Sequence, residues 1–596
     1  MTRTRILTTL AVCTLAMTAA VAAETPARSG PSATLHALFA DEWQARLARD
    51  PLFASDMGVN EFNDRLPVET PANHRRWLEE DRAFLERLHA IDRGALSDED
   101  RLNYDLFEFD VRSRATLARY RPYLIPILSD EGFHIGIQRM YESMPFNTAA
   151  DYEKYLTRLR TIGGYFDRNI ANMREGLELG ITQPKIILEG MLPSIEGPIV
   201  EKAGDSVFFT PFTTFPEHLS QAERERLRAE GIEAIKTVVV PAYRSYLEFF
   251  RDEYIPGARE EMGRTTFPDG KEWYADLVRY YTTLDDATPE GIHALGLKEV
   301  ARIRGEMDAI IDQVGFEGTF AEFINYLRTD PRFYADSPED LLEKASRIAK
   351  KIDGQMPAFF KTLPRLPYGI MPVPDDIAPN YTSGRYWGAP IGGRRGGWYM
   401  VNTYALDKRP LYTLPALTAH EAVPGHHQQI ALSQELTGLP EFRRAFYPHA
   451  FGEGWGLYSE KLAIEFGIYE TPYDDFGRLS YEMWRACRLV IDTGIHAMGW
   501  SREQARRYLA ENSALSLHNV QTEIDRYISW PGQALAYKMG ELKILELRER
   551  AKRELGPAFD IREFHDVVLL DGGVTLDVLE RQVDDWIRER QSASAP

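Results

Sequence analysis

DYEKYLTRLRTIGGYFDRNIANM, residues 151–173, carries the pattern that decides the fold. Its apolar residues recur every three or four positions, as one buried face of an α-helix requires. These positions are Tyr152, Tyr155, Leu156, Leu159, Ile162, Phe166, Ile170 and Met173. The stretch predicts a long amphipathic helix, and similar periodicity over about residues 30–360 predicts a mainly α fold.

Two further helix starts are marked by capping residues. Thr288-Pro289-Glu290 and Ser337-Pro338-Glu339 each combine a capping hydroxyl, a proline for the first helical position and an acid for the positive end of the helix dipole. We therefore expect helices to begin at residues 289 and 338.

The helical pattern is interrupted between about residues 363 and 415, where proline, glycine and aromatic residues are frequent. Within this stretch WYMVNTY, residues 398–404, is typical of a short strand. No flexible Ser/Gly linker is found, so we predict a single helical catalytic unit over residues 24–596. It would consist of an N-terminal helical part, 24–360, and a motif-bearing part, 361–596.

The first 23 residues resemble a secretory signal peptide. Arg3 and Arg5 precede an apolar run that ends in small residues, which predicts cleavage near Ala22 or Ala23. A retained membrane anchor is the alternative. The polar ETPARSGPS that follows directly favours cleavage.

LAVC, ending at Cys13, resembles a lipoprotein signal only weakly, because Val12 is bulky where a small residue is preferred. We therefore expect an exported, periplasmic protein without a lipid anchor. No later stretch holds about 18 uninterrupted apolar residues, so no membrane association is expected after cleavage.

Composition excludes several classes of partner and site. Removal of residues 1–23 deletes two arginines and no acids, which takes the formal net charge from −20 to −22. Such acidity argues against nucleic acid or an anionic membrane as a partner. Cys487 is then the one cysteine left, so neither an internal disulfide nor a cysteine-rich metal site is expected. The oligomeric state stays open.

HEAVPGHH, residues 420–427, differs by its spacing from H-E-x-x-H, the helical zinc-binding motif. Pro424 occupies the place of the second histidine, and Pro424 with Gly425 must kink or bulge the helix predicted to end here. A two-residue bulge would bring His426 to the position of the second ligand. His427 is the alternative ligand, although an unbroken helix would place it about 10 Å along the axis from His420.

The helix predicted over residues 440–466 offers a third metal ligand, which zinc normally needs. Glu453 is the candidate, because its flanking glycines allow another backbone or a substrate to approach closely. Glu460 lies seven residues later on the same face and would orient a ligating histidine through its other ring nitrogen. Glu421 points away from its neighbour His420 and would accept a proton from zinc-bound water.

Each of these residues alone could be an ordinary buried polar group. Their concentration within residues 420–460 favours a metal site, and we expect one Zn²⁺ per chain. Two histidines and one carboxylate suit zinc better than manganese or iron.

EIDRYISWPGQALAYKMG, residues 523–540, contains a second polar cluster. Tyr537 or Tyr527 could stabilise the oxyanion that forms during peptide hydrolysis. Arg526 or Lys538 could hold a substrate carboxylate.

Two more residues are candidates for contact with substrate. Gln533 follows the Pro-Gly turn of the second cluster. His496 could donate a hydrogen bond to the oxyanion, and a buried core histidine is the alternative interpretation.

Four motifs together resemble the bacterial family called domain of unknown function 885. They are H-E-A-V-P-G-H-H-Q-Q, G-E-G-W-G-L-Y-S-E, R-Y-I-S-W-P-G-Q-A-L-A-Y-K-M-G and R-G-G-W-Y-M-V-N-T, and the resemblance extends over essentially the whole mature chain. That family is distantly similar to helical zinc peptidases, namely carboxypeptidase Taq, angiotensin-converting enzyme and the thimet oligopeptidase and neurolysin group. The resemblance implies a two-lobed helical body with a deep channel and a short β-sheet beside the active site.

By this resemblance His420 matches the first ligand, Glu421 the base and Glu453 the glutamate ligand. Glu460 matches an acid two turns further on, and the glycine-to-tyrosine segment nominates Tyr537. The two-residue Pro-Gly expansion is the departure from the peptidase pattern, and it leaves the second histidine ligand undecided.

The leading functional hypothesis is an exported zinc-dependent peptidase that acts on short peptides through a metal-activated water. A zinc hydrolase of another amide or ester, such as a cell-wall fragment, is the first alternative. A non-catalytic periplasmic binding protein with a degenerate peptidase cleft is the second. Sequence preference and exo- or endo-cleavage stay open.

Overall fold

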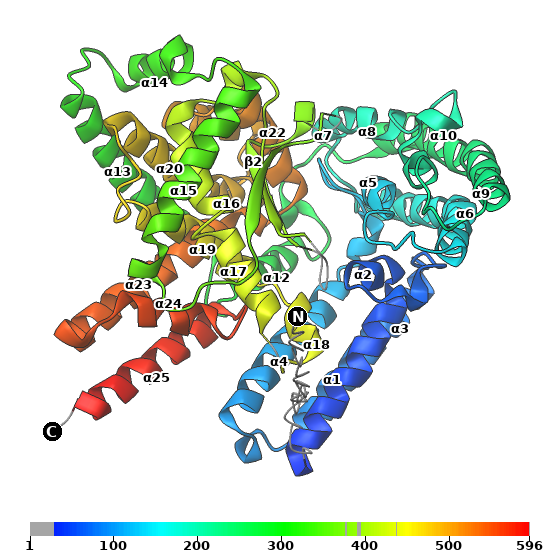
Figure 1. The fold of residues 1–596 in the computed structure, drawn as a ribbon, viewed down its shortest axis with the longest axis horizontal. Coiled ribbons are helices and arrows are strands. Elements are labelled where there is room, and N and C mark those ends of the chain that lie inside the picture. The colour runs from blue at the N-terminus through cyan, green and yellow to red at the C-terminus, as the bar shows by residue number, and fades with distance from the viewer. Residues whose placement is uncertain (1–28, 376–377, 390–394, 437, 595–596) are drawn as a thin grey trace, which may run out of the picture.

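The computed structural model describes residues 29–375, 378–389, 395–436 and 438–594. The predicted signal peptide, residues 1–23, lies outside the described residues. The fold is mainly helical with one small β-sheet, which confirms the predicted fold class (Figure 1).

Short segments of 3₁₀ or π helix lie between several of the α-helices that precede the sheet. These α-helices are α1 (Gly30–Arg49), α2 (Pro51–Asp56), α3 (Pro71–His89), α4 (Asp98–Ala118), α5 (Phe133–Gly136), α6 (Ala149–Leu179), α7 (Lys185–Leu188), α8 (Leu192–Glu196), α9 (Gln221–Ala234), α10 (Val240–Phe249), α11 (Ile255–Gly257), α12 (Gly270–Thr282), α13 (Pro289–Gln313), α14 (Phe320–Thr329) and α15 (Pro338–Phe359).

The α-helices that follow the sheet contain the predicted site. They are α16 (Leu414–Glu421), α17 (His426–Glu435), α18 (Glu441–Ala445), α19 (His449–Leu462), α20 (Pro472–Met498), α21 (Arg502–Asn512), α22 (Leu517–Ser529), α23 (Ala536–Leu555), α24 (Ile561–Leu569) and α25 (Leu576–Ser594).

The helix predicted from residues 151–173 is α6, and all eight positions of its apolar stripe are buried. Thr148 and Asp151 form a capping box at its start. The other predicted starts are also confirmed, because α13 and α15 begin at Pro289 and Pro338.

The helix predicted over residues 440–466 is wrong in one respect, because α18 ends at Ala445 and α19 begins at His449. Pro448 lies between them. It has no N–H to donate and disfavours helical geometry at the preceding residue. The shorter α19 carries both predicted glutamates.

The sheet has strand order β1-β3-β2, in which β3 is parallel to β1 and antiparallel to β2. Its strands are β1 (Tyr368–Pro372), β2 (Gly384–Trp387) and β3 (Gly397–Val401). The strand predicted over 398–404 is therefore shorter than expected. It ends where the Asn402 amide turns inward and donates to the carbonyls of residues 378, 381 and 382.

Two large hydrophobic clusters form most of the core, and each contains residues from both sides of residue 360. The first joins α6, α10 and α13 to α16, α20 and α22. The second joins α1 and α4 to α19, α23 and α25. Figure 1 shows α16, α17 and α19 near the centre of the molecule, beside the sheet.

The backbones of α19 and α23 are in close contact where the two helices cross. A Cβ on Gly540 would lie 1.8 Å from the carbonyl oxygen of Ala450, and one on Gly454 would lie 2.5 Å from the backbone of Gly540. Glycine is therefore required at this crossing, which fixes α19 against the helix that carries Tyr537.

We expect Gly540→Ala to lower the free energy of unfolding by about 1–3 kcal/mol, because the added methyl must push the helices apart. Urea unfolding followed by circular dichroism measures the effect. Gly305→Ala is the matched control, since it lies in α13 with open space around its Cβ, and should stabilise by up to about 1 kcal/mol. Equal stability of the two variants would contradict the close crossing.

Candidate metal centre

The chain between α16 and α17 breaks at the Pro-Gly pair, as predicted. Helix α16 ends at Glu421, and α17 begins at His426 after Ala422 and Gly425 adopt ψ angles of −119° and −125°. A Cβ on Gly425 would lie 1.9 Å from the carbonyl oxygen of His420, so the turn excludes any side chain there. The break holds the two histidine-bearing helices at an angle to each other.

Trp455 of α19 fixes this break from outside. Its indole Nε1–H donates to the carbonyl of Pro424 at 2.7 Å, and the indole is fully buried. The turn is thus tied to the helix that carries Glu453.

His420, His426 and Glu453 come together in one cluster. Nε2 of His420 lies 3.7 Å and Nε2 of His426 lies 3.5 Å from Oε2 of Glu453. One donor atom from each residue lies within 4.8 Å of the other two. The two imidazole rings are 4.7 Å apart and nearly perpendicular, so their Nε2 atoms converge from different directions.

This donor set fits a zinc ion. Zinc bound at about 2.1 Å in tetrahedral geometry separates neighbouring ligand atoms by about 3.4 Å, and the separations to Glu453 are only slightly longer. Two imidazoles and one carboxylate leave a fourth position for water or substrate, which is typical of catalytic zinc sites.

Glu460 orients the His420 ring. Nδ1–H of His420 donates to Oε1 of Glu460 at 2.8 Å, which leaves Nε2 directed towards Glu453. A Cβ on Gly456 would lie 2.7 Å from Cε1 of His420, so glycine makes room for the ring against α19. The structure thus places Glu460 where the sequence predicted it.

The electrostatics of the cluster favour a positive charge between these groups. Burial lowers the pKa of His420, but the nearby carboxylates of Glu453 and Glu460 outweigh this effect and raise that pKa to about 10. Burial would also raise the pKa of Glu453, yet the contacts with His420 and His426 hold it well below its usual value. The carboxylates of Glu453 and Glu460 would attract a bound cation in the same way.

His427, the alternative ligand, faces the sheet instead. Its Nδ1 lies 3.0 Å from the hydroxyl of Tyr386, and its ring lies 4.7 Å from that of Tyr368. Burial lowers its pKa to about 4. The geometry therefore selects His426, because the helix break turns the two consecutive histidines to opposite surroundings.

Glu421 is held at the edge of the sheet. The backbone N–H of Tyr386, in edge strand β2, donates to Oε2 of Glu421 at 2.7 Å. Its negative charge also raises the pKa of His420. The carboxylate is thereby fixed beside the cluster without being one of its three donors.

Tyr537 and Arg526 also lie beside the cluster. Tyr537 is at the start of α23, and no hydrogen bond of its hydroxyl is found among the described residues. The guanidinium of Arg488 lies 4.2 Å from its ring. Arg526 donates to Oε1 of Gln533 at 3.0 Å, so Gln533 positions the guanidinium.

Two predicted substrate contacts are wrong. Lys538 is fully buried and forms ion pairs with Glu482 at 2.8 Å and Glu541 at 2.6 Å, so its ammonium cannot meet a substrate. His496 is also fully buried. Its Nδ1 accepts from the backbone N–H of Arg264, and its Nε2 donates to the carbonyl of residue 527. The core interpretation of His496 is the correct one.

Tyr527 also lies away from the cluster. Its hydroxyl accepts hydrogen bonds from the indole of Trp484 and the guanidinium of Arg488, both at 2.9 Å, and only 1% of the residue is exposed. This buried network contradicts a direct role for Tyr527 in oxyanion binding. The guanidinium of Arg488, which donates to the Tyr527 hydroxyl, also lies against the ring of Tyr537.

Sequence reasoning missed three residues beside the site. The hydroxyl of Tyr447 lies where a Cβ on Gly452 would be 2.2 Å away, and its electrostatic neighbours include Glu453, Tyr537 and Glu421. The other two are His449, at the start of α19, and Arg385, in β2. The Tyr-Pro-His run, which is separated from G-E-G-W by two residues, was the available signal for Tyr447 and His449. Arg385 had none.

The family model for a bacterial protein of unknown function, DUF885, matches residues 51–583. The chain belongs to this family. No curated protein matches this chain.

Two solved structures share the DUF885 fold of this chain. One, described as "the putative lipoprotein from Colwellia psychrerythraea", has 30% sequence identity and a TM-score of 0.88, with 94% of this chain and 100% of that chain covered. The other, "a putative lipoprotein of unknown function from Shewanella oneidensis", has 18% identity and a TM-score of 0.71, with coverages of 93% and 99%. Among the described residues of the present chain, no helix is long and apolar enough to cross a membrane.

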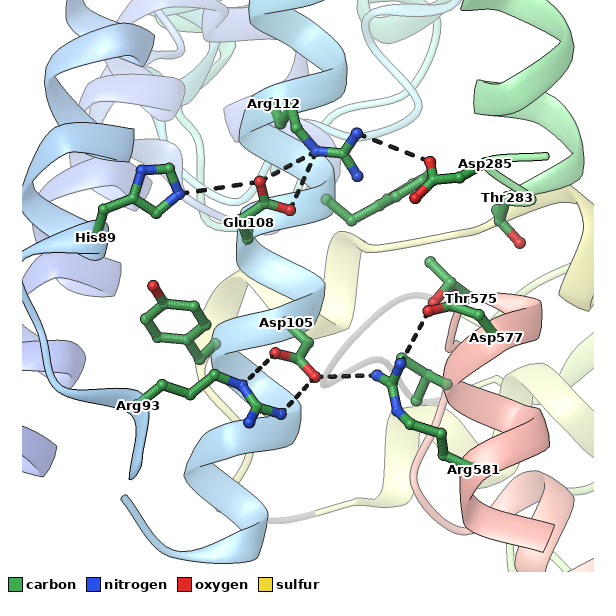
Figure 2. Close-up of a pocket in the computed structure, with 13 residues that line it drawn as sticks. His89, Arg93, Asp105, Glu108, Arg112, Thr283, Asp285, Thr575, Asp577 and Arg581 are labelled. Atoms are coloured by element: carbon green, nitrogen blue, oxygen red, sulfur yellow. Dashed lines mark hydrogen bonds and ion pairs between the residues drawn. The ribbon is translucent and has the colours of Figure 1, made fainter. Parts of the chain in front are cut away.

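A polar cavity of about 450 Å³ lies elsewhere, between α3, α4 and α25 (Figure 2). Its three arginines are paired within the cavity wall: Arg93 with Asp105, Arg112 with Glu108, and Arg581 with Asp105 and Asp577. None of its lining residues belongs to the metal cluster. Its charges join α4 to α25 and leave no cation unpaired.

We expect Glu460→Gln to weaken zinc binding by about 10–100-fold, because the neutral amide polarises the His420 ring less than the carboxylate. Competition with a chelating dye measures the affinity. Glu465→Gln is the control, since Glu465 pairs with Arg548 at 2.6 Å and does not touch the histidines. Unchanged affinity in Glu460→Gln would contradict the assigned role.

The turn before Tyr537 depends on a buried carboxylate. Asp492 is fully buried, accepts from the Tyr274 hydroxyl at 2.6 Å and accepts from the backbone N–H of Gly532 at 3.0 Å. Burial raises its pKa from 3.8 to about 7, although the two hydrogen bonds oppose the shift.

The stability contributed by Asp492 is therefore fully present below its unfolded pKa and is lost as pH rises through the folded value. We expect Asp492→Asn to gain stability relative to the parent protein between pH 4 and 7, because the amide cannot ionise. Urea unfolding across this range measures the difference. A difference independent of pH would show that Asp492 is ionised throughout.

Proposed function

We propose that this protein is an exported zinc-dependent peptidase that hydrolyses short peptides. The observation that carries the proposal is the convergence of His420, His426 and Glu453, with Glu421 fixed beside them. A His₂Glu donor set with an adjacent glutamate is the arrangement in which zinc peptidases activate water.

Zinc would be held by Nε2 of His420, Nε2 of His426 and the carboxylate of Glu453. When bound, it would supply Lewis-acid polarisation of the scissile carbonyl and a lower pKa for the attacking water. Glu460 would keep His420 in the tautomer whose Nε2 is free for the metal.

The chain's own groups would move the protons and stabilise charge. Glu421, held by the N–H of Tyr386, would take a proton from the attacking water and deliver it to the leaving amine. The Tyr537 hydroxyl would donate to the oxyanion of the tetrahedral intermediate. Among the described residues this hydroxyl has no hydrogen-bond partner, which supports its availability for this bond.

An exported location is supported by the leader-like residues 1–23 and by the description of both structural relatives as lipoproteins. That description makes attachment through Cys13 a second possibility beside release by cleavage near Ala23. Mass spectrometry of the processed N-terminus separates them, since a lipidated protein would begin at Cys13.

The test is cleavage of a peptide mixture by the zinc-loaded mature protein, read by mass spectrometry, with the zinc content measured on the same sample. We expect Glu421→Gln to lose about 10²–10⁴-fold in rate and to keep one zinc per chain, because it removes the proton acceptor and no ligand. Muropeptides and esters in parallel reactions test the alternative hydrolase.

Glu441→Gln is the control for this experiment, because Glu441 is exposed on α18, pairs with Arg444 and is not one of the three donors. It should cleave at the parent rate. Absence of cleavage by the zinc-loaded parent protein, or full activity in Glu421→Gln, would refute the proposal.

A further inference from the structure

Two arginines beside the candidate metal centre form no ion pair with any acidic residue that the structure describes. No carboxylate among the described residues lies within 4.0 Å of the guanidinium of Arg385 or of Arg526. Arg526 instead donates to Gln533, and Arg385 lies 6.0 Å from the ring of Tyr381. The arginines of the cavity in Figure 2 differ in this respect, because carboxylates in the cavity wall neutralise all of them.

Both guanidiniums act on the same region of the site. Arg385 belongs to edge strand β2, next to the residue whose N–H holds Glu421, and Arg526 belongs to α22. Each has Tyr537 among its electrostatic neighbours, and each lowers the pKa of Glu131. An anion placed between them would therefore lie beside Tyr537 and within reach of the cluster.

The surrounding charges make this arrangement specific. The chain carries 90 acidic and 70 basic residues, so carboxylates are available to pair with surface arginines. The acids that act on this pair from the facing loop, Asp130 and Glu131, are exposed and stay beyond ion-pair distance. Within the described part of the chain, the site thus keeps two cations without an ion pair in a strongly acidic protein.

A guanidinium presents a planar fork of N–H donors that matches a carboxylate with two parallel hydrogen bonds. Arg385 is exposed and Arg526 is half-buried, so their donors can reach a ligand without breaking an ion pair. Peptides offer carboxylates at the C-terminus and on Asp and Glu side chains.

We infer that Arg385 and Arg526 together bind a carboxylate of the substrate, next to the bond that is cut. The peptides accepted are then those with a free C-terminus or an acidic side chain close to that bond. The cleavage part of this inference rests on the proposed function. The binding part does not.

The experiment uses the zinc-loaded protein and a library of neutral pentapeptides, prepared once with free C-termini and once amidated. A third, amidated library contains Glu, and a fourth contains Gln at the same positions. Affinity selection with mass spectrometry measures retention. Stronger retention of free acids over amides identifies the terminal carboxylate, and stronger retention of Glu over Gln identifies the side chain.

The preferred carboxylate should be retained at least about 10-fold better than its neutral analogue, as expected for charge-assisted hydrogen bonds. Arg385→Gln and Arg526→Gln should each remove most of this preference and raise KM more than they lower kcat. Arg385→Lys should restore part of it, because the charge remains and the fork is lost. Arg112→Gln, in the cavity of Figure 2, is the control and should leave it unchanged.

Equal retention of charged and neutral libraries would overturn the inference, as would a preference that survives both arginine substitutions. A carboxylate preference without cleavage would support this binding site and refute the proposed peptidase. Cleavage without any carboxylate preference would support the proposed peptidase and refute this binding site.

Discussion

The site depends on one hydrogen bond, from the indole of Trp455 to the carbonyl of Pro424. Proline cannot continue the α-helical ladder, so the chain must leave α16 after Glu421 and start again at His426. Trp455 fixes where it restarts. Because Trp455 and Glu453 belong to the same helix, the bond also sets the distance between His426 and the glutamate.

Close backbone approaches hold α19 in this position. Gly456 gives space to the His420 ring, and Gly454 meets Gly540 of α23. Side chains at either position would push α19 outward by more than the few tenths of an ångström that separate a good zinc geometry from a poor one. The glycines of the G-E-G-W-G segment are therefore needed for helix packing, and its glutamate is needed for the donor set.

Charged and polar side chains around the site fall into two groups with different consequences. Lys538 forms ion pairs with Glu482 of α20 and Glu541 of α23, and these pairs hold the two helices together. Arg385, Arg526 and Tyr537 have donors to spare beside the metal cluster. Structural ion pairs are consistent with a rigid frame, and the unpaired donors are where a ligand gains most from binding.

Much of the fold followed from local pattern. The stripe in residues 151–173, the proline-capped starts of α13 and α15, and the strand at residue 398 were all identified from local sequence alone. The helix break at Pro448 was not predicted, although proline cannot donate to the helical hydrogen-bond ladder. Local pattern succeeds where the backbone preference and the buried face agree.

The sequence by itself determined which residue types the site contains: two histidines, the glutamates at 421, 453 and 460, and Tyr537. Only the tertiary structure decided between His426 and His427, because a helix break turns neighbouring residues to different surroundings. It also separated Lys538 and His496 from the site and brought in Arg385 from a strand far away in the chain. Which charges stay unpaired depends on contacts between distant segments, and no local pattern contains that information.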